Sequence, residues 1–150
     1  MTTMLLNHER VVTIERVLRA APKKLWRYFV EPELMKRWGG GESYDFIAID
    51  ADVRPGGVLH QRVATKDGTR RFTFHGVYFE IEEARRLVHT FEWKDDWREP
   101  ADPSLVTILF EERDQSTALT IRHEGLTDDA AESSERHWSE FLGVLESTIG

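Results

Sequence analysis

The sequence predicts an α+β domain in which a curved antiparallel sheet wraps around one long C-terminal helix. Three observations support this class. The middle of the chain reads as successive strands separated by turn residues, with Asp67-Gly68 as a strong hairpin signal. The segment after Thr127 has apolar residues at helical spacing. Two short helices, each beginning near a proline, lie between the first strand and the others.

The N-terminal part contains one strand and the two short helices. Residues 11–18 are rich in β-branched side chains and predict the first strand, which ends at Ala21-Pro22. Pro22 suits the first turn of a helix over 23–30, because its missing N–H costs nothing there. Pro32 begins the second helix, which Gly39-Gly40-Gly41 stops. The apolar residues carried by the two helices are Leu25, Trp26, Phe29, Leu34, Met35 and Trp38.

The next strands follow with turns at 54–57 and 66–69. They are predicted over 44–49, 58–64, 70–81, 85–93, 105–112 and 117–124. Strand 70–81 has apolar residues on both parities: Phe72 and Phe74 against Val77, Phe79 and Ile81. A bulge near Gly76 would place both sets on one side of the sheet. The alternative is a strand that is apolar on both faces for part of its length.

The last two strands form a hairpin around Asp114-Gln115. A turn centred there places His123 opposite Val106, on the inner face of the sheet. The same register pairs Ile108 with Ile121 and Phe110 with Leu119, whereas Thr107, Thr120 and Arg122 take the outer face.

The C-terminal helix changes character along its length. Thr127 is a good N-cap, and Asp128 and Asp129 favour the positive end of the helix dipole. The second half carries an apolar stripe of Trp138, Phe141, Leu142, Leu145 and Ile149. On the same face the first half carries the small or polar residues Ala131, Ser134 and Glu135. We therefore expect one end of the helix to pack on a core and the other to cover something open.

Composition excludes several function classes. The 150 residues include no cysteine, which excludes disulfides, a cysteine nucleophile and a cysteine-containing zinc site. The net charge of -7 and the lack of a basic stripe argue against nucleic acid as a partner. No apolar run is long enough to insert into a membrane, and no signal peptide is evident, so we expect a cytoplasmic protein. Five Trp and eight Phe must line a core, a cavity or an interface.

This element order describes the helix-grip fold, although other α+β layouts fit the pattern alone. Short motifs in the same order resemble the polyketide cyclase and START-like (SRPBCC) superfamily, in particular the bacterial branch related to the C-terminal domain of the Hsp90 ATPase activator. The motifs are Ala21-Pro22 with Leu25-Trp26, Glu31-Pro32-Glu33-Leu34 with Trp38, Asp52-Val53-Arg54-Pro55-Gly56-Gly57, Asp67-Gly68, Gly76-Val77-Tyr78, Arg86-Leu87-Val88 with Thr90 and Trp93, Leu105-Val106-Thr107, and residues 119–125.

The resemblance covers the chain from about residue 11, so we divide it into an N-terminal extension, 1–10, and a START-like helix-grip domain, 11–150. It implies a cavity between sheet and helix. The sequence departs from the branch at two positions that border the expected cavity. Glycines follow Trp38 where the branch often has a second aromatic residue, and His137-Trp138 stands where it often has Gly-Trp. We expect a pocket of different shape from those of its relatives.

His123 is the foremost polar candidate. As a group that titrates near neutral pH, it could orient a ligand or transfer a proton. The alternative is a core histidine hydrogen-bonded to its neighbours. The predicted ligand-binding residues are His123, Trp93, Phe74, Tyr78, Ile108, Phe110, Glu135 and Trp138.

The other polar residues give weaker evidence for a functional site. His75 and His89 lie on neighbouring strands, but no metal-ligand spacing occurs, so neither a metal nor a cofactor is expected. No Gly-x-Ser-x-Gly motif accompanies the serines of the last helix. A polar loop over 94–103, with Asp95, Asp96, Trp97 and Arg98, could act as a lid at the cavity mouth.

The sequence therefore favours a protein that binds a small apolar or amphipathic molecule. The first alternative is a cyclase or hydrolase acting on an apolar substrate in the same cavity, with His123, His89, Glu135 and Tyr78 as acid or base candidates. The second is a co-chaperone-like interaction protein. A homodimer through sheet edges or exposed aromatic residues is also compatible with the sequence.

Overall fold

The computed structural model of the protein describes residue 6, residues 8–95 and residues 102–149. Most of the predicted lid loop, including Asp96, Trp97 and Arg98, lies outside the described residues. Among the described residues, no helix is both long and apolar enough to cross a membrane.

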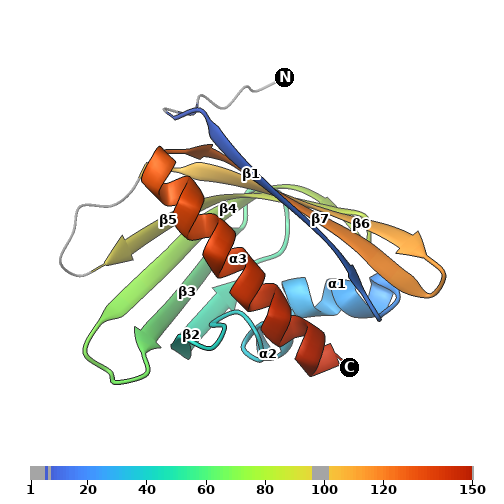
Figure 1. Cartoon of the computed structure of the whole chain (residues 1–150), viewed down its shortest axis with the longest axis horizontal. Helices are drawn as coiled ribbons and strands as arrows, with labels where there is room; N and C mark the ends of the chain where they lie inside the picture. The colour runs from blue at the N-terminus through green and yellow to red at the C-terminus, as the bar shows by residue number, and fades with distance from the viewer. Residues whose placement is uncertain (1–5, 7, 96–101, 150) are drawn as a thin grey trace.

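A single antiparallel sheet and one long helix dominate the described structure (Figure 1). The strands are β1 (Arg10–Leu18), β2 (Tyr44–Ala51), β3 (Val58–Thr65), β4 (Arg71–Glu82), β5 (Arg86–Asp95), β6 (Ser104–Arg113) and β7 (Ser116–Leu126). The helices are α1 (Pro22–Val30), α2 (Pro32–Met35) and α3 (Asp128–Ile149). The strand order is β1-β7-β6-β5-β4-β3-β2, and α3 crosses one face of the sheet. This arrangement is the helix-grip fold, and it confirms the predicted fold class.

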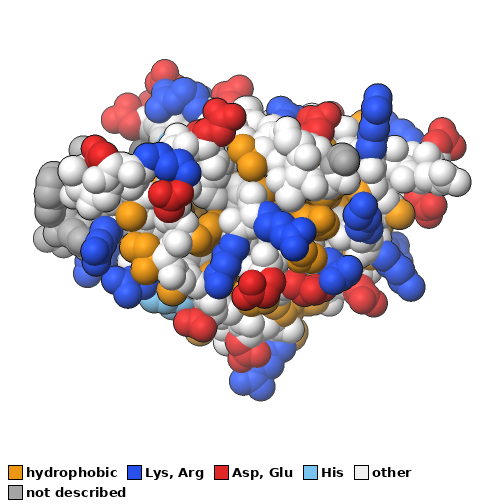
Figure 2. Space-filling model, turned by 90° about the horizontal axis from the view of Figure 1, so that it is seen from below, with side chains coloured by type: hydrophobic (Ala, Val, Ile, Leu, Met, Phe, Trp, Pro, Cys, Tyr) orange, Lys and Arg blue, Asp and Glu red, His pale blue; other side chains and the backbone are white. Residues whose placement is uncertain are grey.

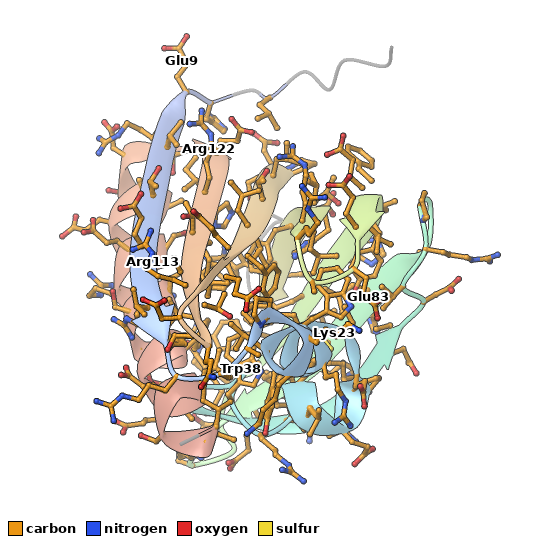
Figure 3. All side chains as sticks on the ribbon, turned by 90° about the vertical axis from the view of Figure 1, so that its right-hand side faces the viewer. Glu9, Lys23, Trp38, Glu83, Arg113 and Arg122 are labelled. Atoms are coloured by element: carbon orange, nitrogen blue, oxygen red, sulfur yellow. The ribbon has the colours of Figure 1, made fainter. Side chains whose placement is uncertain are left out.

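The two short helices close one end of the space between sheet and α3. Pro22 occupies the first turn of α1, and Pro32 that of α2, as predicted. α2 ends at Met35, earlier than predicted, and Trp38 lies in the turn that follows. There the amide of Trp38 donates to the Met35 carbonyl, and its indole Nε1 donates to the Tyr28 carbonyl at 2.8 Å. Figure 3 shows Trp38 inside the molecule, whereas Glu9 extends outward from the start of the sheet.

The β6-β7 hairpin has the predicted register. Asp114 and Gln115 have positive φ values of 50° and 67°, which a two-residue hairpin turn requires. Val106 pairs with His123, Ile108 with Ile121, and Phe110 with Leu119. All six side chains are buried, so this half of the sheet presents an apolar inner face with one histidine in it.

The predicted bulge in β4 lies further along the strand. The β4-β5 register shifts between Tyr78 and Glu80, not near Gly76. Phe72 and Tyr78 are buried, whereas Phe79, the residue at the shift, is 44% exposed. The bulge therefore returns only Ile81 to the side of the core. The prediction that one bulge gathers both apolar sets is wrong, and the alternative of a strand apolar on both faces describes the segment better.

α3 begins as predicted and buries mainly its second half. The Thr127 hydroxyl accepts the N–H of Ala130 at 3.1 Å, which caps the helix. Leu142 and Leu145 are fully buried in the main core. Near the N-terminus of α3, Ala131 packs with Val12 and Leu126.

On the face of the molecule seen from below, charged side chains interrupt the exposed hydrophobic ones (Figure 2).

Candidate functional site

A cavity of about 730 Å³ lies between the inner face of the sheet and α3. Strands β3 to β7 supply most of its wall, and the region of α1 and α2 closes one end. Volumes of this size are typical of small-molecule sites. Its apolar wall includes Phe29, Met35, Trp38, Leu59, Phe72, Phe74, Tyr78, Leu87, Phe91, Trp93, Ile108, Trp138 and Phe141.

The space exists because the first half of α3 is small. Ala130, Ser133 and Ser134 line the cavity on the helix side, where the second half would place leucines. The short side chains leave room above the sheet, which fits the predicted change in character along this helix. Glu135 does not take part: it is exposed, because it lies on the outer side of α3.

His123 sits in the cavity wall with both ring nitrogens hydrogen-bonded. The indole Nε1–H of Trp138 donates to Nδ1 at 3.1 Å, and Nε2 is 2.7 Å from the hydroxyl of Ser104. An indole N–H can only donate, so Nδ1 is the acceptor and Nε2 carries the proton. Nε2–H then donates to Ser104, whose hydroxyl donates to the Phe91 carbonyl at 3.0 Å.

These hydrogen bonds keep the His123 ring neutral. A proton on Nδ1 would face the indole N–H, donor against donor. Burial lowers the pKa of His123 to about 3, and the nearby His89 contributes in the same direction. The ring is therefore a positioned neutral group near pH 7. The alternative considered from the sequence, a buried histidine satisfied by its neighbours, describes its bonding.

Aromatic contacts surround His123 and link the sheet to the helix. Phe91 is edge-on to the His123 ring at a centroid distance of 5.3 Å and stacks on Phe74 at 5.4 Å. Trp138 contacts Phe141 at 6.2 Å. Towards the other end of β4 and β5, Phe72 contacts Trp93 at 5.7 Å. These pairs form a wall that presents ring faces and edges to the cavity.

His89 and Tyr78 form a second polar feature of the wall. They are directly paired across β4 and β5, with ring centroids 5.8 Å apart at 73°. The Nδ1 of His89 is 2.7 Å from the Thr90 carbonyl, which only accepts, so Nδ1 carries the proton. Burial lowers the pKa of His89 and raises that of Tyr78. Both groups are therefore neutral near pH 7.

The structure brings six of the eight predicted site residues to one cavity. These are His123, Trp93, Phe74, Tyr78, Ile108 and Trp138. Phe110 and Glu135 do not line it. Phe110 packs edge-on against Trp26 and Phe29 at 5.4 and 5.3 Å, so α1 covers it.

Sequence reasoning missed Ser104 and placed His89 only among acid or base candidates. Both had a usable signal. Ser104 shares the parity of Val106 and Ile108 on its strand, and His89 shares that of Leu87 and Phe91. His75 is paired with Glu92 on β5, not with His89, and its ring contacts that of His60 at a centroid distance of 6.2 Å.

Two solved structures show the same fold. Protein CV1439 from Chromobacterium violaceum is 23% identical, with a TM-score of 0.83, over 93% of this chain and 96% of that one. The AHSA1 protein from Silicibacter pomeroyi is 21% identical, with a TM-score of 0.80, over 93% of this chain and 97% of that one. A comparison with curated proteins gives no match.

These similarities show that the chain has the helix-grip fold. Residues 19–150 match the family model of Activator of Hsp90 ATPase homolog 1-like proteins. The chain belongs to this family, as its motifs indicated.

Proposed function

We propose that the protein binds a small apolar or amphipathic molecule in the cavity between the sheet and α3. The observation that carries the proposal is the cavity itself, about 730 Å³ enclosed mainly by aromatic and aliphatic side chains. Pockets for small ligands combine such walls with a few polar groups. Burial of the ligand's apolar surface, at roughly 25 cal/mol per Å², supplies most of the binding energy before ordering costs.

The bonding of His123 supports binding rather than acid-base chemistry at this residue. To accept a proton from a substrate, Nδ1 would first have to lose the Trp138 indole. Burial works in the same direction, because it lowers the pKa of His123 to about 3. The residue instead fixes Trp138 against the sheet. In this proposal His123 shapes the wall that the ligand contacts.

Filling the cavity from the helix side should weaken binding. Ser134→Phe places a ring where a small side chain lines the cavity. We expect the affinity for N-phenyl-1-naphthylamine, a neutral probe that fluoresces in apolar surroundings, to fall at least about tenfold, since the ring takes volume that the probe needs. Fluorescence titration of the purified variant measures the change.

Ser139→Phe is the matched control, because Ser139 lies on the exposed side of the same helix. This variant should bind the probe as the unmodified protein does. Thermal unfolding of both variants shows that the loss does not come from unfolding. Equal binding by the folded Ser134→Phe and Ser139→Phe variants would contradict the proposal.

A further inference from the structure

The cavity wall contains a polar pair whose hydrogen bonds are incomplete among the described residues. Tyr78 lines the cavity and is fully buried, and its hydroxyl has no hydrogen-bond partner among the described residues. Its cross-strand neighbour His89 also lines the cavity. A buried polar group without a partner is rare in folded proteins and calls for an explanation.

One ring nitrogen of His89 is already hydrogen-bonded within β5. The Nδ1–H of the ring is used by the Thr90 carbonyl at 2.7 Å. The opposite nitrogen, Nε2, is then an unprotonated acceptor, and among the described residues it has no hydrogen-bond partner. His123 cannot play this part, because both of its nitrogens are engaged by Trp138 and Ser104.

The pair therefore offers one acceptor, Nε2 of His89, and one hydroxyl, that of Tyr78, on rings whose centroids are 5.8 Å apart. A ligand oxygen that both donates and accepts matches this set: its O–H donates to Nε2, and the Tyr78 hydroxyl donates to the same oxygen. An ether lacks the donor. A carboxylate lacks it too, and it would bring a charge to two neutral groups in an apolar wall.

Arg70, a cationic side chain that lines the cavity, lies far from this pair. It precedes β4 and is eight residues from Tyr78, which is about 26 Å along an extended strand. Its guanidinium stands 5.0 Å from the centre of the Phe72 ring. A ligand anion attracted to Arg70 would therefore sit at the other end of the cavity.

Building on the proposed function, we infer that the ligand is an apolar molecule with a neutral hydroxyl, a phenol or an alcohol, and that this hydroxyl binds between His89 and Tyr78. The inference assigns the ligand's polar group to β4 and β5. The sequence had suggested His123 and Glu135 for this role. The inference also gives the buried Tyr78 hydroxyl a partner.

Three naphthalene probes of one shape test the inference: 2-naphthol, 2-methoxynaphthalene and 2-naphthoate. We expect 2-naphthol to bind the unmodified protein about tenfold more tightly than the methyl ether, because the ether leaves the polar pair without a donor. His89→Leu should reduce this preference to less than about threefold, and Tyr78→Phe should reduce it in part. His60→Leu, on the opposite face of the sheet, should leave it unchanged.

A spectroscopic readout needs no variant. In long-range ¹H–¹⁵N NMR spectra, the Nε2 resonance of His89 should shift when 2-naphthol is added and stay in place when the ether is added. This measurement and Tyr78→Phe keep the test decisive if His89→Leu does not fold.

The outcomes separate the inference from the proposed function. Equal binding of naphthol and ether, or an unmoved Nε2 resonance, overturns the inference and leaves the apolar cavity as a binding site. Tightest binding of 2-naphthoate overturns it in favour of an anion site. Failure of all three probes to bind overturns the proposed function as well.

Discussion

Replacing Gly76 with alanine should lower the free energy of unfolding by about 3 kcal/mol, an effect at the upper end for overpacking. A Cβ at this position would lie 2.2 Å from the carbonyl oxygen of Thr90. The obstacle is backbone of the neighbouring strand, so it cannot rotate away. The same carbonyl accepts the Nδ1–H of His89, and the Thr90 hydroxyl accepts the amide of Val77 at 2.8 Å. The substitution therefore forces β4 and β5 apart where they hold the polar pair.

Gly143→Ala is the matched control. Gly143 lies in α3, where a Cβ would meet nothing within 4 Å, so alanine should stabilise the helix by about 0.5–1 kcal/mol. Urea unfolding of both variants measures the two changes. The same glycine-to-alanine change should lower the free energy of unfolding at position 76 and raise it at position 143. A Gly76→Ala variant as stable as the unmodified protein would show that the two strands do not approach as closely as described.

Acidification from pH 7 to pH 5 should cost about 2 kcal/mol of stability through His123 alone. In the unfolded chain a histidine titrates with a pKa of about 6.5, whereas in the fold burial lowers the pKa of His123 to about 3. Between these values the unfolded state binds the proton and the native state does not, so stability falls as the pH falls. The loss begins near pH 6.5 and is complete near pH 3. At 1.36 kcal/mol per pH unit, pH 5 corresponds to about 2 kcal/mol.

His123→Gln isolates this contribution. A glutamine can accept from the Trp138 indole and donate to Ser104, but it does not titrate. The variant should therefore lose about 2 kcal/mol less than the unmodified protein between pH 7 and pH 5, measured by urea unfolding at each pH. His89, whose pKa is also lowered by burial, remains in both proteins and cancels in the difference. Identical pH dependence in the two proteins would refute the description of His123 as a buried neutral group.

The sequence predicts the parts of the fold that local rules control. The β6-β7 register follows from the two-residue turn at Asp114 and Gln115, since a hairpin register is set by its turn. The start of α3 follows from Thr127 and the acidic residues after it. The family motifs add the order of the other elements. Each of these features depends on residues close together in the chain.

The bulge in β4 shows where local rules fail. Glycine at position 76 suggests a bulge, but its role is to let the Thr90 carbonyl approach. That carbonyl belongs to another strand, and its position depends on the β4-β5 register. The real shift follows Tyr78, where the sequence has an aromatic residue and no glycine.

The sequence predicts where the candidate site lies better than it predicts the hydrogen bonds within it. Strand parity placed His123, and helical spacing placed Trp138, around one space. It could not tell which histidine has both ring nitrogens hydrogen-bonded. That depends on the Ser104 hydroxyl, which comes from the strand next to His123, and on the Thr90 backbone carbonyl, which is adjacent to His89. Phe110 has the parity of the inner face of the sheet, yet α1 covers it. Parity does not tell which helix covers a given inward-facing side chain.

Native mass spectrometry of the protein purified from the cells that make it tests the central claim, that the cavity holds a small apolar or amphipathic molecule. The account predicts a second mass peak, above that of the chain, from a retained small molecule. This peak should persist in Ser139→Phe and disappear in Ser134→Phe. Fragmentation of the complex then identifies the chemical class of the molecule. A peak that is unchanged in the folded Ser134→Phe variant, or the mass of the bare chain alone together with no binding of apolar probes, would contradict the account.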